Sequence, residues 1–336
     1  MGVWAVAGLY VAGVIGAGFA SGQELIVFFV NYGSAGLVGA LWAVLLLLLG
    51  TGLILESCAK HRASSYGQLF RALDRKLSIL LEGLYGLFLL VGSSVMFAGM
   101  GAAASSPGKD LALRICSALL VYAILRGGVS SVVKVGGWLA PLLAVGLCGV
   151  AVMHLRQQPW VRPGPMGGWA ALWPALEAGT LYACYNLGFA LAYLASSSRY
   201  LTAKGQRWLV ALGGSGVLGL TMLLLYFALG TLSVAQLQEP FPLANLVRGW
   251  GNTAVKTYTL LLWCAMFSTA AANSLALSSW FAQLDGLNWG AAALVAVGAG
   301  LAFSHLGFTR LISLAYPVLG LAGLWLLAQV VRDAVS

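Results

Sequence analysis

The chain contains few charged residues: only 8% of its 336 residues are Asp, Glu, Lys or Arg, whereas 60% are hydrophobic. A soluble globular domain carries about a quarter charged residues, so this composition excludes that class. The apolar runs are also longer than the roughly ten-residue alternating strands of a membrane barrel. The sequence therefore predicts an all-α integral protein of the cell membrane.

Groups suited to catalysis or metal binding are scarce too. The three histidines lie apart, and the five cysteines stand in apolar segments without CxxC or metal-ligand spacing, which favours packing roles. No set of residues converges as a catalytic constellation, so neither enzyme activity nor an organic cofactor is expected. The net charge of +9 comes from basic residues scattered over loops and helix ends, which membrane topology explains better than nucleic-acid binding.

Apolar segments of spanning length recur along the whole chain, beginning with a first segment that lacks the basic start of a signal peptide and is therefore expected to be retained. Eleven basic residues fall on one side and seven on the other, which predicts that both termini are cytoplasmic. Ten transmembrane helices are predicted, over residues 3–30, 35–58, 78–104, 111–126, 136–155, 169–197, 207–232, 254–281, 289–305 and 309–331.

A linker rich in proline and glycine, residues 156–168, divides these segments into two sets of five. Because five is odd, the second set must enter the membrane with the opposite orientation, which is the condition for an inverted repeat. The sequence therefore predicts a first repeat over 1–155 and an inverted second repeat over 169–336.

Two connections are longer than a simple turn requires. Residues 59–77 have an amphipathic pattern, so we expect this segment to lie on the inner membrane surface. Residues 233–253 lie on the outer side in the predicted topology, and this loop is placed to cover an extracellular vestibule.

Within the first predicted helix, residues 14–24 contain three glycines and a carboxylate, Glu24. Irregular backbone within a membrane persists only where protein buries it or where it lines a cavity, so a break here predicts a binding site. Ser21 and Glu24 have the spacing of a capping box that would restart the helix. Capping alone would explain Glu24, and the alternative is a role in substrate or proton handling.

The sixth predicted helix carries Asn186 and Gly188 at a comparable depth. Interruptions at corresponding positions of two repeats are the best sequence pointer to the central site of a transporter, so helices 1 and 6 are both predicted to be broken. The competing interpretation is ordinary interhelical packing. Glu177, earlier in the same helix, is a second candidate for gating or proton handling.

The opening segment GVIGAGFASGQE, residues 13–24, resembles that of the YkvI-like bacterial membrane proteins. These are similar to the amino acid, polyamine and organocation transporters, whose LeuT-type fold has ten helices in a 5+5 inverted repeat. The resemblance implies the same fold here. It also implies a sodium site formed by the carbonyls of Ala12, Ile15 and Ala265 and the hydroxyls of Ser268 and Thr269.

The spacing of Ala265, Ser268 and Thr269 independently places these residues on one helical face. Bonding of the two hydroxyls within their own helix is the simpler alternative. Proton-coupled relatives tend to carry a lysine in helix five, and residues 135–153 contain neither Lys nor Arg. This absence favours sodium over a proton as the coupling ion.

The candidate substrate site combines exposed backbone amides, a carboxylate and aromatic side chains near both predicted breaks. Helix N-termini favour a substrate carboxylate, whereas Glu24 favours an ammonium group, so the sign of the substrate stays open. The residues are Gly16, Ala17, Gly18, Phe19, Ser21, Gln23, Glu24, Tyr182, Tyr185, Asn186, Gly188 and Phe189.

The leading hypothesis is a secondary transporter that moves a small organic solute, an amino acid or amine, by alternating access with sodium coupling. The alternatives are a proton-coupled transporter and a receptor that uses the same fold to bind a ligand and signal, as germination receptor subunits do. A channel would need an oligomeric pore or rings of like charge, and the sequence offers neither. The expected partners are the solute and the lipid bilayer; the sequence leaves the oligomeric state open.

Overall fold

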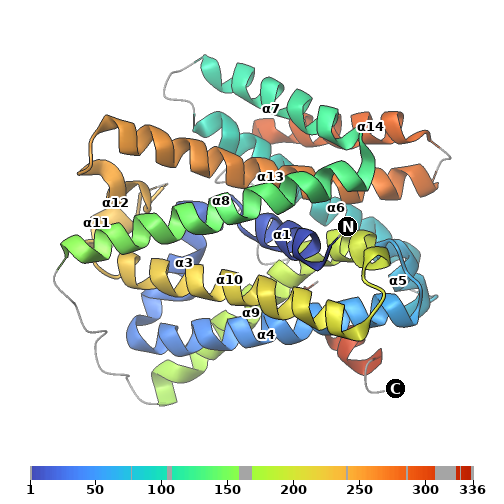
Figure 1. Ribbon diagram of the computed structural model, residues 1–336, viewed down its shortest axis with the longest axis horizontal. Coiled ribbons are helices and arrows are strands. Elements are labelled where there is room, and N and C mark those ends of the chain that lie inside the picture. The colour runs from blue at the N-terminus through green and yellow to red at the C-terminus, as the bar shows by residue number, and fades with distance from the viewer. Residues whose placement is uncertain are drawn as a thin grey trace.

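The computed structural model describes residues 2–76, 78–103, 108–158, 169–239, 241–284, 287–306, 323–325 and 327–333, and these residues contain helices and no strands. The long helices lie side by side in a bundle (Figure 1). The α-helices are α1 (Val3–Val14), α2 (Ala17–Ser21), α3 (Gln23–Phe28), α4 (Gly33–Lys60), α5 (Tyr66–Leu73), α6 (Ser78–Ala102), α7 (Lys109–Leu125), α8 (Gly128–Gln157), α9 (Trp169–Ser197), α10 (Lys204–Leu229), α11 (Val234–Leu237), α12 (Ala244–Arg248), α13 (Asn252–Leu284) and α14 (Trp289–Phe303). Three short 3-10 turns, Val30–Tyr32, Ser198–Tyr200 and Ser304–Leu306, follow α3, α9 and α14.

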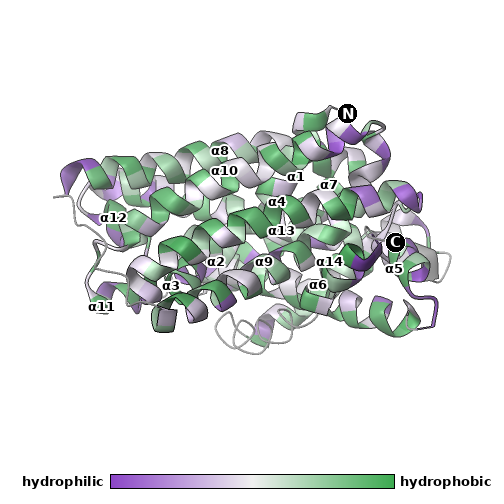
Figure 2. Ribbon diagram, turned by 90° about the horizontal axis from the view of Figure 1, so that it is seen from below, coloured by the Kyte–Doolittle hydropathy of each residue, from purple (hydrophilic) through white to green (hydrophobic). Residues whose placement is uncertain are grey.

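Six helical segments among the described residues are long and apolar enough to cross a membrane: Gln23–Lys60, Ser78–Ala102, Gly128–Gln157, Lys204–Leu229, Asn252–Ala282 and Trp289–Leu306. Figure 2 shows hydrophobic residues along the length of the bundle and hydrophilic residues gathered near its two ends. Large apolar side chains such as Ile79 and Trp138 are 83% and 81% exposed, as expected where a protein faces lipid. The count of ten spans stays a prediction, because segment 309–331 lies mostly outside the described residues.

The first apolar segment is divided into short helices. α1 ends at Val14, and Gly16 adopts an extended conformation with φ −94° and ψ −163° before α2 begins. Gly22 then has φ +90°, a left-handed conformation that glycine adopts without steric cost, and it separates α2 from α3. Gly22 rather than Ser21 is the N-cap of α3, and it offers no side chain for capping. The predicted Ser21 capping box is therefore wrong.

The sixth apolar segment is continuous, so the predicted break at Asn186 and Gly188 is wrong. α9 runs without interruption from Trp169 to Ser197. The side-chain amide of Asn186 donates to the carbonyl of Tyr182 one turn earlier at 3.0 Å, within an unbroken helix. Glycine within a helix costs only about 1 kcal/mol relative to alanine, so packing can hold it helical.

Close packing against α4 fixes the first half of α9. A Cβ atom placed on Gly179 would lie 2.4 Å from the carbonyl oxygen of Gly39, and one on Gly39 would lie 2.4 Å from that of Ala175. Only residues without side chains allow two helix backbones to approach this closely.

The division into repeats over 1–155 and 169–336 stays a prediction. The predicted linker begins in the last turn of α8 and ends just before α9.

The amphipathic segment contains α5, whose Tyr66, Leu69 and Phe70 are buried within the protein. Its position on the inner membrane surface stays a prediction. Arg71 of this helix binds the carboxylate of Glu82 on α6 through two hydrogen bonds of 2.7 and 3.0 Å. Glu82 is thus an ion-pair partner at one end of the bundle. The described ends of the chain also lie toward this end (Figure 2). The cytoplasmic location of both termini stays a prediction.

Candidate functional site at the interrupted first helix

The interruption at Ile15 and Gly16 lies inside the protein, where α6, α9 and α13 surround it. A Cβ atom on Gly16 would lie 3.3 Å from the hydroxyl of Thr269 on α13 and 3.6 Å from the sulfur of Met96 on α6. One on Gly13 would overlap the ring of Tyr193 on α9, 2.6 Å away. Three helices far apart in sequence therefore meet the point where α1 ends.

Oxygen atoms gather on one side of this point. The Ser268 hydroxyl donates to the carbonyl of Ala12 at 2.7 Å and to that of Ala265 at 2.9 Å. The Thr269 hydroxyl lies 3.1 Å from the carbonyl of Gly13 and 3.4 Å from that of Ala12. We call these five oxygen atoms, from Ala12, Gly13, Ala265, Ser268 and Thr269, the oxygen cluster.

Four of the five residues predicted for a sodium site contribute to this cluster. Neither hydroxyl bonds to the fifth, Ile15, among the hydrogen bonds of the described residues, and the carbonyl of Gly13 joins the cluster instead. Both hydroxyls reach across to α1, so bonding within α13 alone does not account for them. Each hydroxyl also keeps lone pairs that a cation can use when its hydrogen turns away.

The predicted substrate residues of the first segment lie close to one another and form two groups. The Glu24 side chain is buried over Gly18, because a Cβ atom on Gly18 would lie 2.1 Å from a carboxylate oxygen of Glu24. Ser21 and Gln23 instead contact residues of the segment 233–253: Leu243 N–H donates to the Ser21 carbonyl at 3.0 Å, and the Gln23 amide donates to the Glu239 carbonyl at 3.4 Å. That this segment lies on the outer side and covers a vestibule stays a prediction.

Aromatic rings connect the first segment to α9 and α6. The ring centroid of Tyr182 lies 4.9 Å from Phe29 and 5.5 Å from Tyr185, and Glu24 is near enough to interact with Tyr182 electrostatically. Phe189, one turn further along α9, lies 4.3 Å from Phe88. Rings at these separations gain about 0.5–1.5 kcal/mol per pair beyond their buried area.

The sequence predictions did not include Phe28, Phe29 or Phe88, because each stands in an apolar run typical of lipid-facing helix. Phe28 lies 5.6 Å from both Tyr182 and Tyr185. Phe19, in contrast, is fully buried in α2. Phe28 and Phe29 therefore connect the first segment to the rings of α9.

Two buried polar side chains near the interruption were also missed. Asn273 and Tyr193 are 0% exposed, and the side-chain amide of Asn273 and the hydroxyl of Tyr193 have no hydrogen-bond partner within the described residues. A Cβ atom on Gly92 would lie 2.8 Å from the Asn273 nitrogen and 2.5 Å from the ring of Phe189. A buried polar group without a partner costs about 1–3 kcal/mol, so such groups require an explanation.

The sequence did hold a signal for Asn273, which stands four residues after Thr269 and therefore on the same helical face. Glu177, the other carboxylate considered in helix six, is exposed on the surface of α9 and lies outside this enclosed region. Lys134 is exposed as well, near the start of α8. The interior candidates are thus Glu24, Asn273, Tyr193 and the oxygen cluster.

Known proteins resemble the chain in sequence and in fold, although no family model matches it. The sequence is 26% identical over 329 residues to the uncharacterized membrane protein YkvI of Bacillus subtilis (strain 168), covering 94% of this chain and 91% of that protein. This similarity and the six apolar helices support a multi-pass membrane protein.

Three solved transporter structures align with most of the chain. MhsT in complex with L-phenylalanine has a TM-score of 0.67 at 17% identity, covering 93% of this chain and 79% of MhsT. A Na⁺-coupled sialic acid symporter has a TM-score of 0.65 at 12% identity, covering 96% of this chain and 76% of the symporter. Mhp1, a nucleobase-cation-symport-1 family transporter, has a TM-score of 0.53 at 13% identity, covering 90% and 71%. The chain therefore has the helical fold of the LeuT-type transporters, as its opening motif predicted.

Proposed function

We propose that the protein is a secondary transporter that moves a small organic solute across the membrane by alternating access, coupled to sodium. The observation that carries the proposal is the oxygen cluster, in which two hydroxyls of α13 meet backbone carbonyls where α1 ends. Free carbonyls at a helix interruption and neighbouring hydroxyls suit a hard cation. The fold shared with three transporters supports this assignment.

Sodium would replace the hydrogen bonds that now join α1 to α13. Ser268 and Thr269 would turn their hydrogens away and offer oxygen lone pairs to the ion, together with the carbonyls of Ala12, Gly13 and Ala265. The ion would then hold two helices in one relative arrangement. A ligand shifts a conformational equilibrium only when it binds one arrangement better than another, and an ion shared by α1 and α13 meets that condition.

We place the solute beside the cluster, between the first segment, α6, α9 and α13. Glu24 would attract an ammonium group, and the buried amide of Asn273 offers both a donor and an acceptor. The ring of Tyr182 and the neighbouring aromatic residues would contact an apolar or cationic portion of the solute. These features fit an amino acid or an amine.

Sodium is preferred over a proton because no basic residue of α8 reaches the cluster: Lys134 is exposed, and residues 135–153 contain neither Lys nor Arg. Proton coupling through Glu24 is the second candidate, since a buried carboxylate is suited to carrying a proton. A ligand-binding receptor is the third candidate.

We also propose that both termini are cytoplasmic, because the distribution of basic residues predicts this orientation.

Uptake into liposomes tests the proposal. The purified protein is reconstituted, and uptake of radiolabelled amino acids and amines is measured with an inward gradient of sodium or of potassium. Sodium-dependent uptake is expected, with loss in the Ser268→Ala, Thr269→Ala double variant. Ser279→Ala is the matched control, because among the described residues that hydroxyl bonds within α13, to the carbonyl of Leu275 at 3.0 Å.

Each other outcome selects a different function. Uptake that a proton gradient drives and that does not respond to sodium would refute sodium coupling and support proton coupling through Glu24. Ligand binding without any flux under either gradient would refute transport and support the receptor.

A further inference from the structure

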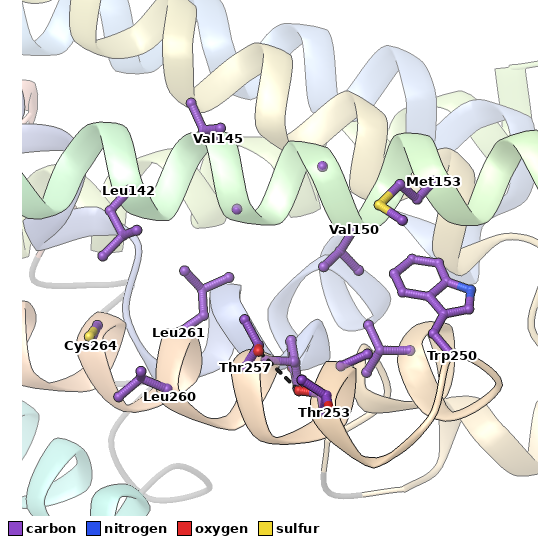
Figure 3. Close-up of a pocket in the computed structure, with 15 residues that line it drawn as sticks. Leu142, Val145, Val150, Met153, Trp250, Thr253, Thr257, Leu260, Leu261 and Cys264 are labelled. Atoms are coloured by element: carbon purple, nitrogen blue, oxygen red, sulfur yellow. Dashed lines mark hydrogen bonds between the residues drawn. The ribbon is translucent and has the colours of Figure 1, made fainter.

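A groove of about 620 Å³ separates α8 from α13 on the outside of the bundle. Its walls are almost entirely apolar side chains of these two helices (Figure 3). Leu142, Val145 and Met153 on α8 are 52%, 72% and 52% exposed, and Leu260 on α13 is 61% exposed. In a membrane-embedded bundle, such a surface faces lipid.

A glycine of α8 leaves part of the groove open. Gly146 and Gly149 both line it; the side chain of Leu261 packs against Gly146, 2.8 Å from a Cβ position there, whereas a Cβ atom on Gly149 would meet no atom within 4 Å. The space above Gly149 is therefore open. In a bilayer a long apolar groove of this kind is filled by hydrocarbon, because leaving it empty forfeits dispersion contacts along its length.

One end of the groove has a polar character. Trp250 closes it there, and the indole N–H donates to the side-chain oxygen of Gln157 at 2.8 Å. Thr253 and Thr257 line the same end, and Figure 3 shows Trp250, Met153 and Thr253 near one another. Tryptophan is typical of the membrane–water interface, so this end belongs at the level of the lipid headgroups.

Two basic residues flank the groove at this end. Arg156 stands three residues after Met153 and continues the lining face of α8 by about one turn. Lys256 stands between the lining residues Thr253 and Thr257 in the first turns of α13, and the side chains of a helix tilt toward its N-terminus, which here lies at the Trp250 end. Both side chains are exposed, and neither forms an ion pair within the part of the chain that the structure describes. The neighbouring Arg248 is already paired with Glu239 at 2.7 Å.

We propose that this groove is a binding site for one anionic phospholipid, whose acyl chain lies between α8 and α13 and whose phosphate lies between Arg156 and Lys256. The apolar walls fit the chain, and two cations without an ion-pair partner among the described residues fit a headgroup of net negative charge. A zwitterionic headgroup would bring its own cation and gain less from this end of the groove. The proposal is independent of the transported solute and of the coupling ion.

Native mass spectrometry of the purified full-length protein tests the proposal, with equal amounts of phosphatidylglycerol and phosphatidylethanolamine added. Wild type should retain one phosphatidylglycerol in preference to phosphatidylethanolamine. Gly149→Phe should remove this retention by filling the groove. Lys256→Gln and Arg156→Gln should each weaken it about fivefold, the equivalent of roughly 1 kcal/mol for one basic residue near anionic lipid.

Matched controls separate this site from general lipid adhesion. Gly298 on α14 is also exposed with open space at its Cβ position, so Gly298→Phe should leave retention unchanged, as should Lys109→Gln at the exposed start of α7. The proposal is overturned if Gly149→Phe folds and retains phosphatidylglycerol like wild type, or if wild type retains both lipids equally. If Gly149→Phe does not fold, equal retention by wild type, Lys256→Gln and Arg156→Gln would overturn it.

Discussion

The first apolar segment and α9 carry similar sequence features, yet one is interrupted and the other is a continuous helix. Each has a glycine and a polar residue in mid-span. In the first segment Gly16 is extended and Gly22 is left-handed, whereas Gly188 lies within unbroken α9. Glycine therefore permits an interruption without imposing one.

The two segments differ in which groups form hydrogen bonds with their backbone carbonyls. Where α1 ends, the carbonyls of Ala12 and Gly13 accept hydrogen bonds from Ser268 and Thr269. In α9 the Asn186 side chain bonds to a carbonyl of its own helix. A break within a membrane persists only when other groups satisfy the freed backbone, and α13 supplies such groups to α1. The comparison teaches that the partner helix, rather than the glycine, decides where the helix is interrupted.

The largest expected effect is on stability, from replacing the glycine that separates α2 from α3. Gly22→Ala forces alanine into φ +90° and places its Cβ atom 2.9 Å from Leu243. We expect a loss of about 2–4 kcal/mol, since a left-handed alanine costs roughly 1–2 kcal/mol and overpacking adds a similar amount. Thermal unfolding in detergent measures it.

Gly188→Ala is the matched change in α9, where the nearest atom, on Phe88, would lie 3.3 Å from the new Cβ. Its stability should stay within about 1 kcal/mol of wild type, because alanine favours the helix and Phe88 must shift only slightly. Equal losses in the two variants would remove the distinction between the two regions.

The next largest effect concerns the oxygen cluster. Wild type should gain about 2.7 kcal/mol of unfolding free energy when sodium reaches a hundred times its dissociation constant, because an ion that binds only the folded state stabilises it by mass action. The Ser268→Ala, Thr269→Ala variant should lose this gain while staying folded. Unfolding temperatures in sodium and in potassium give the measurement, and Ser279→Ala should respond to sodium like wild type.

A smaller effect is expected for Glu24, the carboxylate buried over Gly18. Glu24→Gln keeps the shape and removes the charge and the titratable proton, so folding should persist. Affinity for an amine or amino acid should fall about tenfold or more, equivalent to roughly 1.4 kcal/mol. Calorimetric titration at several pH values measures it, and an unchanged affinity and pH profile would leave Glu24 a structural role only.

The smallest effect should come from Asn273, whose buried amide has no partner within the described residues. Asn273→Leu removes a desolvated polar group at similar volume, so stability should stay unchanged or rise by about 1 kcal/mol. Solute binding should nevertheless weaken, because a buried polar group that lowers stability is typically kept where activity needs it. A variant that loses stability and keeps full affinity would show that Asn273 serves the fold instead.

Much of the fold was predictable because membrane constraints act locally on composition. Long apolar runs and short polar connections located α4, α6 to α10, α13 and α14, and the amphipathic pattern of residues 59–77 coincides with α5; the short helices α11 and α12 were not predicted. The opening motif predicted the fold shared with the transporters, and the spacing of Ser268 and Thr269 predicted their common face. These features depend on one segment at a time, so one sequence suffices to identify them.

The sequence by itself determined that the chain is a helical membrane protein and that its first segment contains backbone able to depart from a helix. Only the tertiary structure decided that α9 is continuous, that Gly22 rather than Ser21 precedes α3, and that Gly13 joins the oxygen cluster. It also decided that Asn273 and Tyr193 lie buried beside the interruption. The physical reason is that a glycine, a hydroxyl or an amide has several local conformations of similar energy, and contacts from distant helices select among them.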